Sequence, residues 1–434
     1  YEPQLWRMGA CRPTIDGTIV GFEKKGKDTY ALIDTSDVHT LMIAAAGTGK
    51  TTFFLEPNIE YCCAAGMSFI STDTKGDIYR NCGYVAAKRY GYKISVIDLR
   101  NPLKSDGFNL LHLVKKYMDE HKNNPLNISA KAKSERYAKI VADSIIAADG
   151  DKYGANTYFY DAAKGLIAAL ILIIAEYGND KECHIVSVLK LMIELLEAKP
   201  QKKSQLKSET YFADLIKLLP PEHKARWLSG AAINNADQAA LSVISTALSR
   251  LNSLIDTETE QILCFNTAID TETLCKEKCA VFIVLPEEDR TKYVIANLII
   301  EQISREIYHI ADENGGHLDK RIMIYFEEFG TMPPISGVEA MFSALRSRSV
   351  SIVAIIQSFA QLEKNYGKQG AEIIVDNTQL MLFGGFAPGS SSAEKLSKDL
   401  GKQTILTGSI SKGNGGKNSG HQSQQLQMTG RELI

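Results

Sequence analysis

The sequence predicts an α/β protein with a mostly parallel central sheet into which an all-α domain is inserted. Apolar runs of strand length alternate with helical stretches along roughly the first hundred residues. This order is typical of a parallel sheet covered on both faces. Strand signals become scarce from about residue 111 to 269 and resume at 280–285. This interruption indicates a helical domain inserted into the α/β domain.

The composition sets the size of the core and the expected compartment. Of the 434 residues, 44% are hydrophobic, enough for one large core and a smaller one. A net charge of −2 gives no overall attraction to nucleic acid, so any DNA contact needs a local basic lining. The eight cysteines include no C-x-x-C pair, and Cys275 and Cys279 lack a matching histidine pair. We therefore expect reduced thiols and a cytosolic compartment.

The first part of the chain carries the predicted start of the sheet. Short strands and turns are expected up to about residue 38, with Gly17, Gly21 and Gly26 as turn positions. We expect this segment to extend an edge of the main sheet. Strands of the main sheet follow at 41–43, 67–72 and 94–98, with a helix ending near Tyr90.

The predicted insertion consists of helices. They are expected at 130–147, 158–177, 185–196 and 237–254. The longest strictly apolar run, 166–175, is too short to span a bilayer, so we expect a buried helix there. We therefore predict that the chain has three parts. Residues 1–110 and 270–434 are the two halves of a nucleotide-binding domain, and residues 111–269 are the inserted all-α domain.

The second half of the sheet is predicted from a helix and three strands. A helix with one apolar face is expected at 292–312, followed by strands at 322–326, 351–356 and, more weakly, 379–383. The tail at 408–425 is rich in Gly, Ser, Asn and Gln and has no periodicity. We expect a mobile loop there.

A phosphate-binding loop is predicted where the strand at 41–43 turns into a helix. Its residues are Ala44, Ala45, Ala46, Gly47, Thr48, Gly49, Lys50, Thr51 and Thr52. Small residues let successive N–H groups point inward, and the helix start adds its positive dipole end. Lys50 would reach the β- and γ-phosphates, and the Thr51 hydroxyl would ligate Mg²⁺. An ordinary glycine turn is the alternative, which the strand-then-helix context disfavours.

The strand at 322–326 ends in two carboxylates, Glu327 and Glu328. Because the carboxyl-terminal ends of parallel strands all lie on the same side of the sheet as the phosphate loop, both acids are expected to face the phosphates. Glu327 would hold Mg²⁺, directly or through water, and Glu328 would orient and deprotonate the attacking water. Solvated acids after a strand are the alternative, which a phosphate loop in the same chain disfavours.

Two polar positions flank the strand at 351–356. Arg346 and Arg348 precede it, and a ring-forming ATPase needs an arginine that reaches the γ-phosphate of a neighbouring subunit. Ordinary surface arginines are the alternative. Gln357 ends the strand and would sense the γ-phosphate or water, or merely cap the sheet.

In this order, these motifs resemble the type IV secretion coupling proteins, the ATPases that link a relaxase–DNA complex to a conjugation channel. The resemblance runs from about residue 39 to 433. It is carried by 44–52, by 73–79, by Asn101-Pro102 with Ser105 and Asn109, by Glu327-Glu328-Phe329-Gly330, by 346–348, and by Gln357-Ser358 with Gln361-Leu362.

The resemblance implies a RecA-like P-loop motor domain that assembles as a homo-hexameric ring, with the helical insertion facing the cytoplasm. By position, Lys50 and Thr51 fall on the Walker A lysine and hydroxyl, and Glu327 and Glu328 on the Walker B acids. Arg346 falls on the proposed arginine finger, and Gln357 on the motif that couples nucleotide state to DNA.

The resemblance also implies a location. Family members are usually anchored by N-terminal transmembrane helices at the cytoplasmic face of the bacterial inner membrane. The present chain begins at Tyr1 without a methionine or signal peptide. We therefore expect a preceding anchor segment that is absent from this sequence.

Two positions depart from the family pattern. Glycine usually stands where this chain has Ala44, and the added methyl could tighten the loop. Aspartate usually stands where it has Glu327, and one extra methylene shifts the carboxylate by roughly 1.5 Å. We expect slow catalysis with nucleotide binding preserved.

The leading prediction is an ATP- and Mg²⁺-dependent translocase that drives DNA, expected to be single-stranded and relaxase-bound, through a ring. Lys75 and the basic loop at Lys202 and Lys203 are candidates for substrate contact; solvated charges are the alternative. A second hypothesis is a nucleotide-binding receptor that recruits protein substrate, with ATP setting only its assembly state. A P-loop small-molecule kinase is disfavoured. Such enzymes are usually shorter, and the sequence gives no reason why one would have a large helical insertion before the Walker B strand.

Overall fold

A seven-stranded parallel sheet forms the centre of the computed structural model. The structure describes residues 4–8, 15–147, 157–196, 211–230, 237–289, 292–386, 389–411 and 421–430. The strand order is β10-β4-β9-β8-β5-β7-β6, and each neighbouring pair is parallel. The strands are β4 (Thr40–Ile43), β5 (Ser68–Asp73), β6 (Lys93–Asp98), β7 (Cys279–Val284), β8 (Ile322–Phe326), β9 (Val350–Ile356) and β10 (Leu380–Phe383). The predicted parallel sheet is confirmed, and the strand boundaries lie close to the predicted ones.

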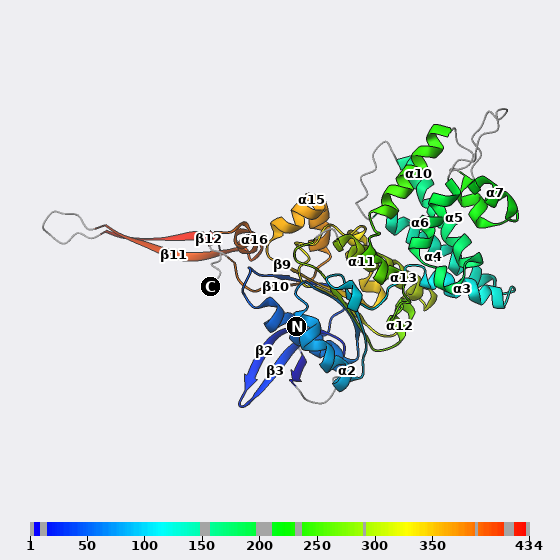
Figure 1. Cartoon of the computed structure of the whole chain (residues 1–434). Coiled ribbons are helices and arrows are strands. Elements are labelled where there is room, and N and C mark those ends of the chain that lie inside the picture. The colour runs from blue at the N-terminus through cyan, green and yellow to red at the C-terminus, as the bar shows by residue number, and fades with distance from the viewer. Residues whose placement is uncertain are drawn as a thin grey trace.

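Both faces of this sheet are covered, which explains why its strands read as continuous apolar runs. Along β5, Phe69 packs into one hydrophobic cluster and Ile70 into the other. The cluster around Phe69 includes side chains of α1 (Glu56–Ala65) and α2 (Tyr84–Tyr90). The opposite cluster takes in α13 (Tyr293–Glu313), α14 (Val338–Ala344) and α15 (Phe359–Asp376). The structure is therefore a helix–sheet–helix sandwich (Figure 1).

The N-terminal strands form a sheet of their own, so the predicted edge extension is wrong. Strands β1 (Gln4–Arg7), β2 (Thr18–Lys25) and β3 (Asp28–Asp34) pair antiparallel in the order β1-β3-β2. Their apolar side chains pack on α1, where Trp6 meets Tyr61 edge to face. The Asn58 side chain also bonds both the N–H and the C=O of Ile19. These contacts hold the small sheet against the helix layer instead of in the plane of the large sheet.

The stretch between β6 and β7 folds into helices, as predicted. They are α3 (His112–Asn123), α4 (Ile128–Ala147), α5 (Thr157–Tyr177), α6 (Ile185–Leu196), α7 (Tyr211–Leu218), α8 (Lys224–Leu228), α10 (Asp237–Asn252), α11 (Thr257–Leu263) and α12 (Thr271–Lys276). Because β6 and β7 are neighbours at one edge of the sheet, this whole stretch is one crossover connection. Figure 1 shows most of its helices gathered beside the sheet. Whether domain borders fall at residues 110 and 269 stays a prediction.

Helix α5 is the core of the helical part. It is the one helix within the described residues that is long and apolar enough to cross a membrane, and it is mostly buried. It packs against α4, α10 and α8, and its residues 166–175 are all buried. The buried helix predicted from the short apolar run is confirmed.

The tail is the second place where the prediction fails. Strands β11 (Lys402–Ser411) and β12 (His421–Gly430) pair antiparallel, with Ser411 opposite His421. The mobile loop predicted at 408–425 is therefore wrong for 408–411 and 421–425, while 412–420 lie outside the described residues. Main-chain hydrogen bonds define a strand pair, and a Gly-, Ser- and Gln-rich sequence can make them without an apolar period.

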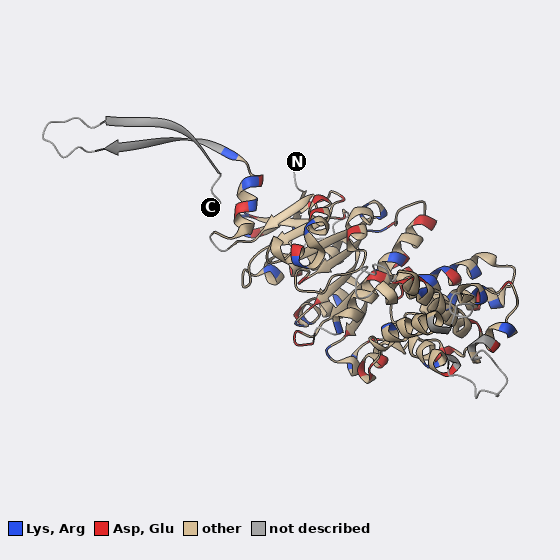
Figure 2. Ribbon diagram, turned by 90° about the horizontal axis from the view of Figure 1, so that it is seen from above, with Lys and Arg blue, Asp and Glu red and all other residues tan. Residues whose placement is uncertain are grey.

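Charged residues of both signs are spread over the molecule, in keeping with a net charge of only −2. Figure 2 shows basic and acidic positions interspersed over both the sheet and the helical part. The seven cysteines in the described part of the chain are free thiols, and most of them are buried. The basic loop at Lys202 and Lys203 lies outside the described residues.

The closest approach of α5 to α8 gives a stability prediction. A Cβ at Gly165 would lie 2.5 Å from the Leu228 carbonyl oxygen, so Gly165→Ala forces the two helices apart. Overpacking costs about 1–3 kcal/mol, against a helix-propensity gain of about 1 kcal/mol for replacing glycine. We expect lower thermal stability by circular dichroism, with Lys139→Ala on the exposed face of α4 as a neutral control. An equally stable Gly165→Ala variant would contradict this packing.

Candidate nucleotide site

The loop after β4 is held in place by backbone hydrogen bonds from both neighbouring strands. Ala44 N–H donates to Ile356 C=O at 3.1 Å, and Ala45 N–H donates to Gly385 C=O at 3.1 Å. Beyond them the chain turns through Gly47 at φ 77° and Gly49 at φ 79°. Only glycine adopts these left-handed conformations at little cost, which gives the two predicted loop glycines a physical role.

Lys50 begins a π-helical turn, Lys50–Leu55, that leads into α1. The Lys50 ammonium folds back over the loop and donates to Ala44 C=O at 3.1 Å and Ala45 C=O at 3.3 Å. The Thr48 hydroxyl donates to the same Ala45 carbonyl at 2.9 Å. The lysine is therefore held over the loop by main-chain carbonyls and not by a carboxylate partner.

The methyl of Ala44, one of the departures from the family pattern, is accommodated by a glycine from another strand. Ala44 is fully buried. A Cβ at Gly384 would lie 2.7 Å from the Ala44 Cβ and 2.9 Å from Met42 Cε. The alanine methyl thus lies against the hydrogen of Gly384, just after β10, and the loop does not need to tighten around it.

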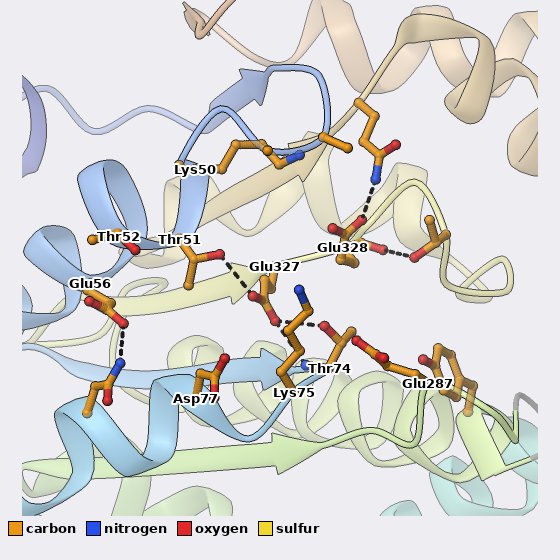
Figure 3. A pocket seen from close by; sticks show the side chains of 17 residues that line it. Lys50, Thr51, Thr52, Glu56, Thr74, Lys75, Asp77, Glu287, Glu327 and Glu328 are labelled. Atoms are coloured by element: carbon orange, nitrogen blue, oxygen red, sulfur yellow. Dashed lines mark hydrogen bonds between the residues drawn. The ribbon is translucent and has the colours of Figure 1, made fainter.

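Glu327 connects the phosphate loop with the end of β5. Its Oε1 accepts a hydrogen bond from the Thr51 hydroxyl at 3.1 Å. Its Oε2 accepts from the Thr74 N–H at 2.9 Å and from the Thr74 hydroxyl at 3.0 Å. Figure 3 shows Thr51 and Thr74 on either side of this carboxylate. The glutamate at this position thus reaches the loop hydroxyl directly.

Burial makes this carboxyl a weaker acid. Glu327 is 6% exposed, and desolvation raises its pKa. Hydrogen bonds from Thr74 and Thr51 lower the pKa in part, whereas the negative charge of Asp73 raises it further. A divalent cation beside the Thr51 hydroxyl would favour the charged form.

Glu328, which follows β8, and Gln357, which follows β9, are hydrogen-bonded to each other. The Gln357 side-chain amide donates to Glu328 Oε2 at 3.3 Å. The Gln357 backbone N–H donates to Gln361 Oε1 at 2.9 Å. Gly330 leaves room for this Gln361 side chain, which a Cβ there would strike. The family pattern at 357–361 thus positions the Gln357 amide beside the second acid.

These groups line a cavity of about 570 Å³ along the carboxyl ends of the strands. It receives residues from the ends of β4, β5, β7, β8 and β9, as expected for an open parallel sheet. Five carboxylates, Glu56, Asp77, Glu287, Glu327 and Glu328, face two ammonium groups, Lys50 and Lys75 (Figure 3). A polyphosphate entering this acidic cavity needs an added cation.

The donor set fits an open Mg²⁺ site. Thr51 and Glu327 present hard oxygen atoms to the cavity, and Mg²⁺ is usually held by one or two protein oxygens together with phosphates and water. In the described residues no group of three or more His, Cys, Asp or Glu side chains could enclose a metal by itself. The remaining ligands would therefore come from phosphate and water.

Arg346 lies away from this cavity. It precedes β9 and so lies at the amino-terminal ends of the parallel strands, whereas the phosphate loop lies at their carboxyl-terminal ends. Arg348 pairs with Asp312 at 3.3 Å and stacks over Tyr308, while Arg346 is exposed. Within one chain Arg346 cannot reach the phosphates, so any action on them requires a second subunit.

Other residues of the pattern have structural contacts outside the cavity. Asn109 accepts from Leu111 N–H at 2.9 Å and donates to Cys183 C=O at 2.8 Å, which ties the first helix of the insertion to its neighbours. The Ser105 hydroxyl accepts from Asp98 N–H at 2.9 Å. These bonds fix the path of the chain as it leaves β6.

Sequence reasoning assigned no nucleotide-site role to several residues that line the cavity. Thr74 is the most informative, because it gives Glu327 two hydrogen bonds. Glu287 after β7 and Thr331 after β8 also line the cavity. The rule that strand ends of a parallel sheet share one edge could have found them. Lys75 lines the cavity as well, and its predicted contact with transported DNA stays a prediction.

Comparison with known proteins places this fold and site in a family. The sequence profile described as Type IV secretory system Conjugative DNA transfer matches residues 9–434. The chain belongs to this family. The type IV secretion system-coupling protein VirD4 of Bartonella henselae is 21% identical over 390 residues, covering 88% of this chain and 56% of the relative. VirD4 of Bartonella quintana is also 21% identical, over 391 residues, with the same coverage. This chain thus spans little more than half of these coupling proteins.

Solved structures of a coupling protein show the same fold. The bacterial conjugative coupling protein TrwBdeltaN70 aligns with a TM-score of 0.61 at 12% identity, over 92% of this chain and 79% of that one. TrwB in complex with ADP and Mg²⁺ aligns with a TM-score of 0.58 at 13% identity, over 85% and 75%. The present fold is accordingly the RecA-like P-loop fold of the coupling proteins.

The contact between Ala44 and Gly384 gives a second stability prediction. Gly384→Ala places two methyl groups on the same space and should destabilise the protein by about 1–3 kcal/mol. The added substitution Ala44→Gly frees that space and should restore most of the loss. Free energies of unfolding from urea titration measure the coupling in a double-mutant cycle.

The exposed Ala46 supplies the control for this cycle. Ala46→Gly changes the same loop without touching Gly384, so it should not rescue Gly384→Ala. Equal rescue by both glycine substitutions would show that loop flexibility, and not the methyl contact, is responsible.

Proposed function

We propose that this chain is the nucleotide-hydrolysing part of a type IV secretion coupling protein that drives relaxase-bound DNA, expected to be single-stranded, through a conjugation channel. The observation that carries the proposal is the Thr51–Glu327 hydrogen bond, which joins the phosphate loop to the acid at the end of β8. ATP with Mg²⁺ is the proposed cofactor pair. Complexes of TrwB with ADP and Mg²⁺, and with a non-hydrolysable ATP analogue, support that choice.

Each cavity residue has a proposed role that follows from its position. The loop N–H groups and Lys50 bind the phosphates, since the ammonium can exchange its carbonyl partners for phosphate oxygens. Thr51 and Glu327 would hold Mg²⁺, which when bound neutralises charge on the β- and γ-phosphate oxygens. Thr74 keeps the Glu327 carboxylate directed at Thr51.

Glu328 and Gln357 are the proposed groups that act on water. Glu328 is the base that accepts a proton from the attacking water, and the Gln357 amide holds the carboxylate in place through its 3.3 Å bond. A shift of this amide on loss of the γ-phosphate would be transmitted along the Gln357–Gln361 contact into α15. This path links hydrolysis to movement of a surface helix.

Arg346 is the proposed arginine finger, and it would act on a neighbouring subunit. Its place at the amino-terminal ends of the strands, opposite to the phosphate loop, supports action in trans. We therefore propose a homo-hexameric ring at the cytoplasmic face of the inner membrane, with the relaxase and other secretion components as partners. The curated relatives extend well beyond the length of this chain, so these partners are proposals for the whole protein.

The proposed activity is tested by steady-state ATP hydrolysis with and without single-stranded DNA, over a range of protein concentrations. We expect turnover to rise with both, because catalysis needs a subunit interface. Lys50→Ala should abolish turnover, since the phosphates lose their charge partner, whereas Lys139→Ala should leave it unchanged. Tight ATP binding without DNA-stimulated turnover would instead favour the nucleotide-binding receptor.

Mixing two inactive variants tests the arginine finger. Lys50→Ala lacks a working phosphate site but keeps Arg346, and Arg346→Ala keeps the site but lacks the finger. In a mixed ring, an intact phosphate site of an Arg346→Ala subunit can face the intact arginine of a neighbouring Lys50→Ala subunit. The mixture should therefore hydrolyse ATP faster than the summed rates of the two variants measured separately. Absence of this recovery, with mixed rings demonstrated, would contradict action in trans. Arg348→Ala is the matched control, because its side chain pairs within its own subunit.

A further inference from the structure

A second groove borders the phosphate loop on the side away from the acids. It has a volume of about 300 Å³ and is lined by Val20 and Phe22 of β2, Met42 of β4, Phe53 after the loop, and Leu382 and Phe383 of β10. Gly49 and Lys50 line both this groove and the phosphate cavity. The two spaces therefore lie on either side of the same loop residues.

The groove presents aromatic surface to solvent. Phe53 is 73% exposed and Phe22 is 43% exposed, and neither belongs to the two hydrophobic clusters of the core. Burial of such side chains is favourable, so a large aromatic ring left open beside a ligand cavity needs an explanation.

The position of the Phe53 ring is fixed by the loop itself. A Cβ at Gly49 would lie 2.5 Å from Phe53 Cδ2, so the ring rests directly on the Gly49 backbone. The Phe53 N–H also donates to Gly49 C=O at 2.8 Å. The ring is thus held against Gly49, a residue that also lines the phosphate cavity, while the ring itself lines the groove.

We propose that this groove binds the purine base of the nucleoside triphosphate, with Phe53 and Phe22 as the stacking residues. The inference rests on the proposed function, since it requires the triphosphate to occupy the loop. A nucleotide held there by its phosphates must direct its base to one side. The groove offers that base an apolar and aromatic surface that begins at the loop residues Thr48, Gly49 and Lys50.

The lining also determines how selective the groove is. Its polar side chains are Thr48 and Lys50, and both donate to the Ala45 carbonyl. Its other side chains offer stacking and no hydrogen bonds to the edge of a base. Adenine and guanine should therefore bind with similar affinity, because stacking does not distinguish their edges.

Val20 and Phe22 of β2 line the groove, so in this proposal the N-terminal sheet takes part in nucleotide binding. This gives the sheet a use beyond covering α1. Binding of ATP should slow amide exchange in β2 (Thr18–Lys25), whereas a ligand confined to the phosphate cavity should leave that strand unchanged.

Competition between ATP and inorganic tripolyphosphate tests the proposal, because tripolyphosphate has no base. With Mg²⁺ present, we expect Phe53→Ala and Phe22→Ala each to weaken ATP binding about tenfold, within the range expected for loss of one base–aromatic stack. Neither variant should change the affinity for tripolyphosphate. Phe265→Ala, an exposed phenylalanine that does not line either space, is the control.

The other outcomes separate the possible failures. If wild-type protein binds neither ligand, the proposed nucleotide function fails and the groove has no base to hold. If ATP binds but both variants leave its affinity unchanged, the base lies elsewhere and only this inference is overturned. Equal weakening of ATP and tripolyphosphate would show that the rings shape the loop, which also overturns it. Phe22→Ala is decisive here, since Phe22 lies on β2, whereas Phe53 rests on the loop glycine.

Discussion

The two oxygens of the Glu327 carboxylate hold together three segments that are far apart in the sequence. One oxygen accepts from Thr51 at the start of the helix after β4, and the other accepts twice from Thr74 after β5. A buried carboxylate is costly unless hydrogen bonds or a cation compensate it. The strand order β4-β9-β8-β5 brings the carboxyl-terminal ends of these strands close together, and all of these partners lie there. The site therefore depends on the sheet topology.

The edge strand β10 supports the loop from the other side. Its continuation supplies the Gly385 carbonyl to Ala45 and leaves space at Gly384 for the Ala44 methyl. The alanine of the phosphate loop is thus matched by a glycine more than three hundred positions away in sequence. The same edge forms one wall of the aromatic groove. Loop shape and groove shape therefore depend on the same strand.

The helical insertion leaves the sheet at the end opposite to β10. It connects β6 and β7, which lie at the far edge, so a large connection is added without disturbing the phosphate loop. A cluster of polar bonds marks the junction: Gln302 of α13 donates to Leu110 C=O at 2.9 Å, and His112 of α3 meets Asp270 at 3.2 Å. The Gln302 bond links the start of the insertion to α13, in the helix layer that covers one face of the sheet, and the His112 contact joins the two ends of the insertion.

What the sequence determined by itself is local. The apolar runs of β5, β7, β8 and β9 reflect burial on both faces, and the order of small residues, Lys50 and Thr51 after a strand indicates the phosphate loop. Acids following a buried strand could be placed at the same edge because parallel strands share it. These signals are strong because each one depends on neighbours in the chain.

Only the tertiary structure decided which distant groups meet. The pairing of Thr74 with Glu327, the space at Gly384 and the open rings of Phe22 and Phe53 arise from contacts between separate strands. The separation of the N-terminal strands from the main sheet and the ribbon of β11 and β12 were not predicted, for a related reason. Antiparallel pairs are fixed by main-chain hydrogen bonds and by the surface available to pack on, and neither has to leave a period in the sequence.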